Sequence, residues 1–202
     1  MAGSVSIKPG EVVSFPTETF FALGCDPRDR AGVELLIELK SRPEEAGLPL
    51  IIADAGWIEQ FIASETEPLR KVRLHLQQQF WPGPLTIVFP VNSAGQQAIR
   101  PEVFGPGSSL AVRVSPDPVA REIARAAGGA VISTSANPRG LPPRKSAAEV
   151  SEYFPSIQVI GGECGGAAKP STIIDLRTLP PKVLREGEIP GSVILSAVQQ
   201  IK

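Results

Sequence analysis

The sequence predicts an α/β fold, and three features of the chain support this class. Short apolar runs of strand length alternate with segments of helical period over most of the 202 residues. Hydrophobic residues make up 42% of the chain, which is enough to bury one sizeable core. The 19 glycines and 21 prolines gather at the junctions between these segments, as is typical of rigid loops. We therefore expect one domain over residues 1–202.

The first quarter of the chain predicts a strand, a helix and a second strand. Residues 11–15 are an apolar run that ends at Pro16, whose missing amide proton interrupts a sheet ladder. Residues 31–40 place apolar side chains at helical spacing, and Pro43 prevents this helix from continuing. Residues 48–53 are again an apolar run of strand length.

The same alternation continues to the end of the chain. Helical period is found at residues 57–62, 69–80 and 119–127. Further apolar runs of strand length are residues 85–91, 110–114, 130–134, 157–160 and 172–176. The segment after Pro190 predicts a short terminal helix.

The charge balance and the cysteines exclude several classes of protein. With 20 basic and 21 acidic residues, the chain lacks the strong positive field that drives nonspecific nucleic-acid binding. Cys25 and Cys164 are far apart and form no CxxC pair, so neither a disulfide framework nor a zinc site is indicated. No basic stretch with a following apolar run opens the chain, and no window approaches the ~20 apolar residues that span a bilayer. We expect a cytoplasmic protein without membrane contact.

Hydroxyl, amide and basic side chains concentrate in the loops that follow the predicted strands and the first helix. They are Thr17 and Thr19, Lys40 and Arg42, and Ser135 and Asn137. Open α/β sheets bind ligands at such strand ends, and cations beside hydroxyls suit phosphate or carboxylate oxygens. This pattern favours an anionic small molecule as ligand.

A structural interpretation of the same residues stays open at this point. The hydroxyl and amide side chains could satisfy backbone groups in turns, and Lys40 and Arg42 could complement the negative end of the helix. Residues 81–84 are more typical of a rigid packed turn than of a binding platform. The chain has no GxSxG, GxxxxGK[ST] or GxGxxG motif and only one histidine, so common hydrolase, nucleotide and metal motifs give no support. No metal ligands are expected.

Seven fragments occur in a fixed order along most of the chain. They are FPTETFFALGCDP (15–27), LKSRP (39–43), FWPGPLTIVFP (80–90), LAVRV (110–114), STSANPRGLPP (133–143), PSTIID (170–175) and LREGEI (184–189). Together they resemble the motifs of the YrdC-like family of threonylcarbamoyl-AMP synthases. Lys40-x-Arg42 with Ser135-x-Asn137 is similar to the family's KxR and SxN pair. Because the chain stops soon after the last fragment, it resembles the short, single-domain form.

This resemblance implies both a fold and an activity. The implied fold is a single-domain, open, twisted mixed sheet with flanking helices and a basic concave face. The implied enzyme is a nucleotidyltransferase that makes threonylcarbamoyl-AMP and pyrophosphate from L-threonine, bicarbonate or CO2, and ATP, for N6-threonylcarbamoyladenosine in tRNA. Mg²⁺ would enter with ATP. The tRNA and the proteins that transfer the threonylcarbamoyl group could be further partners.

The resemblance also assigns roles to individual residues. Threonine would be held by Thr19, Arg113, Ser135 and Ser171, with Arg113 as the partner of its carboxylate. ATP would be contacted by Lys40, Arg42, Ser109, Asn137, Lys145 and Arg185. The expected catalytic set is Lys40, Arg42, Ser135 and Asn137. Arg144 could serve in place of Lys145, and residues 161–170 could close over the labile intermediates.

The chain departs from the family pattern near the predicted pocket. Phe21-Ala22 replaces a common Tyr-Gly pair, which removes a phenolic hydroxyl, and Ala53 stands where many members carry histidine. These changes leave open a paralogue with an altered amino-acid substrate. The other alternative is a non-catalytic RNA-binding module, against which the near-neutral net charge argues.

Overall fold

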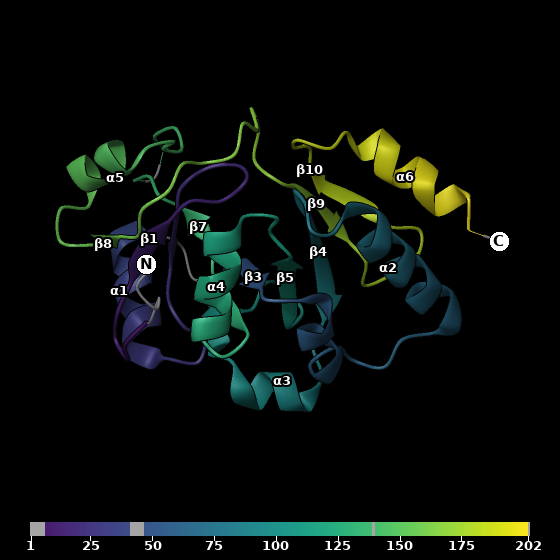
Figure 1. Ribbon diagram of the computed structural model, residues 1–202. Helices are drawn as coiled ribbons and strands as arrows, with labels where there is room; N and C mark the ends of the chain where they lie inside the picture. The colour runs from purple at the N-terminus through teal and green to yellow at the C-terminus, as the bar shows by residue number, and fades with distance from the viewer. Residues whose placement is uncertain (1–6, 41–46, 139, 202) are drawn as a thin grey trace.

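The computed structural model describes residues 7–40, 47–138 and 140–201, in which strands and helices alternate (Figure 1). Its described strands form two sheets, with the orders β7-β2-β1-β8 and β10-β9-β4-β5-β3-β6. Each sheet combines parallel and antiparallel pairs. The predicted α/β class with mixed strand pairing is therefore confirmed, and the pairing is divided between two sheets.

The strands of both sheets are short. The four-stranded sheet contains β1 Val13–Phe15, β2 Ala22–Gly24, β7 Thr134–Ser135 and β8 Gln158–Val159. The six-stranded sheet contains β3 Leu50–Ile52, β4 Leu85–Pro90, β5 Ser109–Arg113, β6 Ala130–Ile132, β9 Thr172–Asp175 and β10 Lys182–Arg185.

Helices flank these sheets on several sides. The α-helices are α1 Arg30–Lys40, α2 Glu67–Phe80, α3 Ser93–Ala98, α4 Pro118–Ala126, α5 Ala147–Tyr153 and α6 Gly191–Gln199. Two 3-10 helices are η2 Ala55–Gln60 and η3 Pro101–Val103. In Figure 1, α5 and α1 lie at the side of β1 and β8, whereas α2 and α6 lie at the side of β4, β9 and β10.

The structure refines several sequence expectations. The predicted strand at 130–134 divides into β6 and β7, which belong to different sheets. Between them, the Ser133 amide donates to the Pro49 carbonyl at 2.8 Å, one position beyond the Leu50–Ile132 pair of β3 and β6. The sequence did not predict β2, β10, α3 or α5, because these elements are short or mostly exposed and so lack a clear apolar period. The segment after Pro190 does form a helix, α6.

Alternating side chains give β4 and β5 two different faces. Leu110 and Val112 of β5, with Ile87 and Phe89 of β4, are buried in the main hydrophobic cluster. This cluster includes residues of α1, α2 and α6 and of both sheets. A second cluster packs α4 against β1, β3 and β6. The opposite face of β4 and β5 is therefore not filled by the main cluster and can take polar side chains.

The turn at residues 81–84 is packed into this framework, as expected. The buried Trp81 indole donates from Nε1 to the Leu85 carbonyl at 2.6 Å. The Gly83 amide donates to the Val114 carbonyl at 2.8 Å. The turn therefore fixes the start of β4 relative to the end of β5.

A buried ion network on α2 provides a test of how the flanking helices are held. Arg73 is 2% exposed, and its guanidinium contacts Glu65 at 2.9 Å and Glu59 at 2.5 Å. Arg73→Met should lower the free energy of unfolding by about 3–5 kcal/mol, because it leaves the Glu65 carboxylate buried and unpaired. Urea unfolding measures this change. Arg70→Met, at an exposed position of the same helix, should change the free energy of unfolding by less than ~0.5 kcal/mol. Equal effects of the two substitutions would show that the ion pairs of Arg73 do not stabilise the fold.

Candidate active site

A cavity of about 530 Å³ lies between the two sheets. Its floor is the face of β4 and β5 that is turned away from the main hydrophobic cluster. Ser109, Ala111 and Arg113 line it from alternate positions of β5, and Thr86 and Val88 line it from β4. The Cα atoms of Ser109 and Arg113 are about 13 Å apart along the strand. The lining thus extends along the length of β5.

Most of the predicted threonine and ATP residues meet in this cavity. The predicted residues that line it are Thr19, Ser109, Arg113, Ser135, Ser171 and Arg185. They come from the loop after β1, from β5, β7 and β10, and from the residue that precedes β9. Because these segments are far apart in sequence, the fold itself is needed to bring their hydroxyl and guanidinium groups together. Arg42 lies outside the described residues.

Lys40 and Asn137 lie behind Ser135, outside the described lining of the cavity. The Lys40 side chain is buried, and its Nζ donates to the Ser135 carbonyl at 2.7 Å and to the Asn137 carbonyl. Asn137 Oδ1 is 3.3 Å from the same Nζ. Lys40 therefore ties the end of α1 to the end of β7 and the residues that follow it, which neither of the two sequence interpretations anticipated.

The loop after β1 is organised by Thr17. Its Oγ1 donates to the Phe20 carbonyl at 2.8 Å and accepts the Thr19 amide at 3.1 Å. This is the turn-forming role that the structural interpretation allowed. The Thr19 hydroxyl, 3.1 Å from that of Thr17, belongs to a buried residue of the cavity wall. Both threonines thus line the cavity, and Thr17 also shapes the turn.

Ser171 belongs to a hydrogen-bonded group at the end of the cavity near β9. Its hydroxyl is 2.8 Å from Thr86 Oγ1 and accepts from Arg185 Nη2 at 3.1 Å. The same guanidinium donates to the Ser171 carbonyl from Nη2 at 2.7 Å. Sequence analysis did not identify Thr86, although its place in the FWPGPLTIVFP fragment and the alternation of β4 both mark it. Arg185 and Ser171 are held together before any ligand binds.

Arg177 is a second cavity residue that the sequence did not identify. It forms two hydrogen bonds to the Asp175 carboxylate, and its Nη1 donates to the Pro106 carbonyl at 2.6 Å. Hydrogen bonding to Arg177 lowers the pKa of Asp175 below its ordinary value. The Ser109 hydroxyl donates to the same Pro106 carbonyl at 3.0 Å. Arg177 therefore fixes the rim of the cavity next to Ser109.

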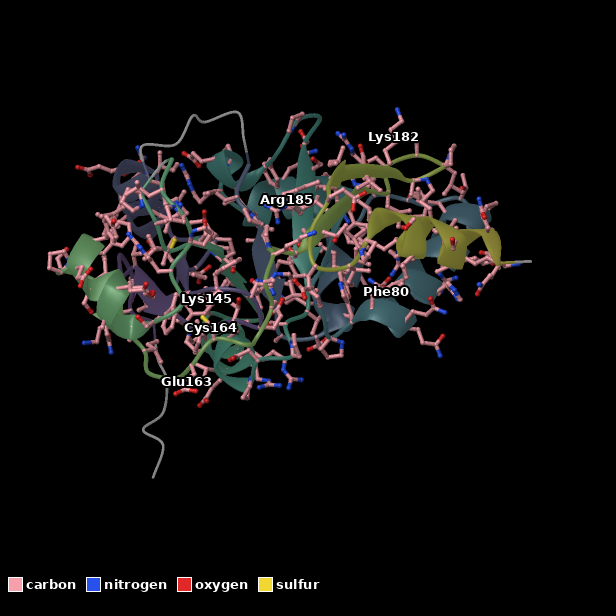
Figure 2. All side chains as sticks on the ribbon, turned by 90° about the horizontal axis from the view of Figure 1, so that it is seen from above. Phe80, Lys145, Glu163, Cys164, Lys182 and Arg185 are labelled. Atoms are coloured by element: carbon pink, nitrogen blue, oxygen red, sulfur yellow. The ribbon has the colours of Figure 1, made fainter. Side chains whose placement is uncertain are left out.

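Lys145, rather than Arg144, is directed toward the cavity wall. Its Nζ is 5.5 Å from the ring of Phe20, which lines the cavity, and donates to the Ala167 carbonyl at 3.3 Å. Arg144 instead packs over the Tyr153 ring at 4.1 Å. In Figure 2, Lys145 lies beside Cys164, and Arg185 projects from the β10 side.

The segment at 161–170 connects β8 of the four-stranded sheet to β9 of the six-stranded sheet (Figure 1), and its last residue, Pro170, lines the cavity. The Gly165 amide donates to the Thr17 carbonyl at 2.9 Å. Near the other end, Glu188 Oε2 accepts the amides of Ala168 at 3.1 Å and Lys169 at 2.9 Å. A Cβ at Gly165 would meet the Glu18 carbonyl oxygen at 2.4 Å, so this close approach requires glycine.

The two departures from the family pattern differ in their relation to the cavity. Phe21 is fully buried and forms part of both the core and the cavity wall. Ala22 pairs with Ser135 between β2 and β7, so it adjoins the predicted threonine residues. Ala53 packs in the α4 cluster and is not part of the described lining. Only the Phe21-Ala22 change therefore bears on what the cavity binds.

The described lining offers cations and hydroxyl groups rather than a metal cage. It contains no carboxylate, and no group of three His, Cys, Asp or Glu residues that could hold a metal occurs in the described ranges. The described lining therefore offers no carboxylate ligand for Mg²⁺, which prefers such ligands. Among the same residues, no helix is long and apolar enough to cross a membrane.

Lys40→Met tests the tie between α1 and the Ser135 loop. It should lower the free energy of unfolding by about 1.5–3 kcal/mol, because the Ser135 and Asn137 carbonyls lose a charged donor. Denaturant unfolding checks this value. Lys71→Met, at an exposed position on α2, is the control and should change it by less than ~0.5 kcal/mol. If Lys40→Met lowered the free energy of unfolding no more than the control does, the hydrogen bonds of Lys40 would not contribute to stability.

Comparisons with known proteins connect this geometry to a family. A family model named Sua5_yciO_yrdC and described as "Telomere recombination" matches residues 6–187. The threonylcarbamoyl-AMP synthase of Chromohalobacter salexigens is 40% identical over 174 residues, which cover 86% of this chain and 90% of that protein. The threonylcarbamoyl-AMP synthase of Methylobacillus flagellatus is 39% identical, with 85% and 92% covered.

Solved structures agree with this relationship. P. abyssi Sua5 complexed with L-threonine superposes with a TM-score of 0.83 at 31% identity, covering 96% of this chain and 55% of that one. The chain thus spans only about half the length of that Sua5. E. coli YciO shares the fold, with a TM-score of 0.72 at 23% identity and with 88% and 84% covered. The chain therefore belongs to the Sua5/YciO/YrdC family and is homologous to the threonylcarbamoyl-AMP synthases within it.

Proposed function

We propose that this enzyme joins L-threonine, bicarbonate or CO2, and ATP into threonylcarbamoyl-AMP and pyrophosphate, for N6-threonylcarbamoyladenosine in tRNA. One observation carries the proposal: hydroxyl and guanidinium groups from distant segments line a single cavity that offers no carboxylate among its described residues. Such a lining suits two anionic substrates held against each other. The threonylcarbamoyl-AMP synthases at about 40% identity support the same reaction.

The threonine end of the cavity is assigned to Thr19, Arg113, Ser135 and Ser171. Arg113 would receive the threonine carboxylate, since a guanidinium can bind a carboxylate through two parallel hydrogen bonds. The hydroxyl groups nearby would bind the amine and the hydroxyl of the substrate. The complex of P. abyssi Sua5 with L-threonine supports an amino-acid site in this fold.

The ATP end is assigned to Ser109, Lys145 and Arg185, together with Arg42. Arg185 is already held by Ser171, so a phosphate on Arg185 would lie next to a threonine on Ser171. Because no carboxylate in the described lining could hold Mg²⁺, the ion would enter on the ATP phosphates rather than on a protein site. Arg177 would keep the rim beside Ser109 in place.

The chemistry needs no enzyme nucleophile. The threonine amine adds to the carbon of CO2 to give a carbamate, and a carbamate oxygen then attacks the α-phosphorus of ATP. The bond from this phosphorus to pyrophosphate breaks. Orientation of two bound substrates can supply about 7–11 kcal/mol, and fixed cations stabilise the charge that develops on the phosphate oxygens. The cavity's guanidinium groups would provide these cations.

In this proposal, Lys40 and Asn137 hold Ser135 in place. Their hydrogen bonds hold the backbone on both sides of Ala136, which fixes the Ser135 side chain at the cavity wall. They therefore hold Ser135 at the cavity wall, and a contact of either side chain with ATP stays a prediction. A single compact domain over residues 1–202 is proposed as well, since the main hydrophobic cluster draws on both sheets. The cytoplasmic location and a direct contact with tRNA stay predictions.

The products distinguish this function from the alternatives. Mass spectrometry after incubation with ATP, bicarbonate and each amino acid in turn should find threonylcarbamoyl-AMP with threonine alone. A different carbamoyl-adenylate would indicate a paralogue whose substrate changed with Phe21-Ala22. No adduct with any amino acid, combined with RNA affinity that falls steeply with salt, would indicate an RNA-binding module.

Arg113→Met should weaken threonine binding by about 10- to 100-fold, because the carboxylate loses charge-assisted hydrogen bonds. Calorimetric titration with L-threonine measures this change. Arg121→Met on α4, away from the described cavity lining, should leave the affinity unchanged and serves as the control. Equal threonine affinity in the two variants would remove Arg113 from the site.

The segment at 161–170 should shield the labile carbamate from water. Gly165→Ala should raise the KM for threonine and release more free pyrophosphate per adduct, because a methyl group there collides with the Glu18 backbone and lifts the segment. Gly166→Ala is a matched control, since a Cβ at Gly166 meets no atom within 4 Å. If both variants released the same amount of pyrophosphate per adduct as wild type does, the shielding role would be excluded.

A further inference from the structure

We propose that Glu18 is a positioning residue that orients the Arg113 guanidinium for the substrate carboxylate. The inference rests on the proposed function, which assigns that carboxylate to Arg113. Glu18 Oε1 accepts a hydrogen bond from Arg113 Nη1, and the two form an ion pair. The second carboxylate oxygen, Oε2, accepts from the hydroxyl of Ser115. The sequence analysis gave no role to Glu18 or Ser115.

Burial makes this ion pair rigid. The Arg113 and Glu18 side chains are only 9% and 11% exposed, and Ser115 is fully buried. A guanidinium in such surroundings needs a nearby counter-charge, because an unpaired buried cation is strongly unfavourable. Ser115 also accepts the Asp117 amide at 3.2 Å, which fixes its hydroxyl at the start of α4. Glu18 is thus held by an anchor that does not depend on Arg113.

Glu18 approaches Arg113 from outside the cavity. Its neighbours Thr17 and Thr19 line the cavity, whereas Glu18 does not belong to the described lining. Gly165 packs against the Glu18 backbone and holds it in this orientation. A substrate carboxylate in the cavity would therefore meet the other side of the guanidinium and would not need to displace Glu18.

The geometry of the contact leaves room for that second carboxylate. A guanidinium carries five N–H donors, and Glu18 engages Nη1. The edge formed by Nε and Nη2 has no hydrogen-bond partner among the described residues, and Arg113 lines the cavity. This edge matches the two oxygens of a carboxylate. Glu18 would fix the plane of the guanidinium so that this edge faces the amino acid.

Calorimetric titration with L-threonine, with L-threoninamide and with ATP tests this role. Threoninamide lacks the carboxylate, so its binding should not depend on the Arg113 edge. Glu18→Ala should raise the Kd of threonine about tenfold, while the Kd values of threoninamide and ATP change less than about twofold. Glu18→Gln keeps one acceptor oxygen for Arg113 but loses the negative charge and the second acceptor, so its threonine Kd should lie between those of wild type and Glu18→Ala.

A double-mutant cycle separates positioning from general damage to the fold. In an Arg113→Met background, Glu18→Ala should have no further effect on threonine affinity, because the residue through which it acts is gone. Ser115→Ala should change threonine affinity in the same direction by a smaller factor. Glu122→Gln, at an exposed position on α4, should leave every Kd unchanged.

The outcomes distinguish this inference from the proposed function. If wild type binds threonine, and Glu18→Gln and Glu18→Ala both bind it with the same Kd as wild type, the positioning role is overturned. Tighter threonine binding by both variants would also overturn it, since Glu18 would then be a competitor of the substrate. If wild type itself binds no threonine, the proposed function fails. Should Glu18→Ala not fold, Glu18→Gln in the same titrations decides the question.

Discussion

The site depends on the two-residue period of β4 and β5. Each strand sends one set of side chains into the main hydrophobic cluster and the other set into the cavity. A shift of β5 by one residue would bury the Arg113 guanidinium in the apolar core, and the same shift of β4 would bury the Thr86 hydroxyl there. The apolar side chains that stabilise the sheet thus also determine which polar groups face the ligands. Turn 81–84 helps to fix this register through its bonds to Leu85 and Val114.

Around this sheet, buried polar groups hold one another in place. Lys40 binds the loop of Ser135, Thr86 and Arg185 bind Ser171, and Glu18 binds Arg113. A charged or hydroxyl group that is buried without a partner is costly, so each contact restricts the side chain to one orientation. The ligand-binding groups are therefore largely ordered before substrate arrives. Such preorganisation is what a reaction that relies on orientation and fixed charges requires.

Much of the fold could be predicted from apolar spacing, because long, strongly patterned elements such as α2 and β4 carry their own signal. Some short elements could not be placed from the sequence; the two residues of β7, for example, are specified by their partner β2 and not by any period of their own. The cavity residues in recognisable motifs were found from their resemblance to a family. Arg177 and Glu18 were missed, because each acts through a residue distant in sequence, Pro106 and Arg113 respectively. Lys40 was correctly connected with Ser135 and Asn137, but its burial behind them depends on tertiary packing.

In the proposed complex, the cavity between the sheets holds threonine with its carboxylate on Arg113. A crystal structure of the protein with L-threonine and an unreactive ATP analogue tests it most directly. We expect the carboxylate on the Nε and Nη2 edge of Arg113, with Glu18 still on Nη1 and the α-phosphate of the analogue next to the threonine amine. Threonine bound elsewhere, or a nucleotide phosphate in place of the carboxylate on Arg113, would contradict the account.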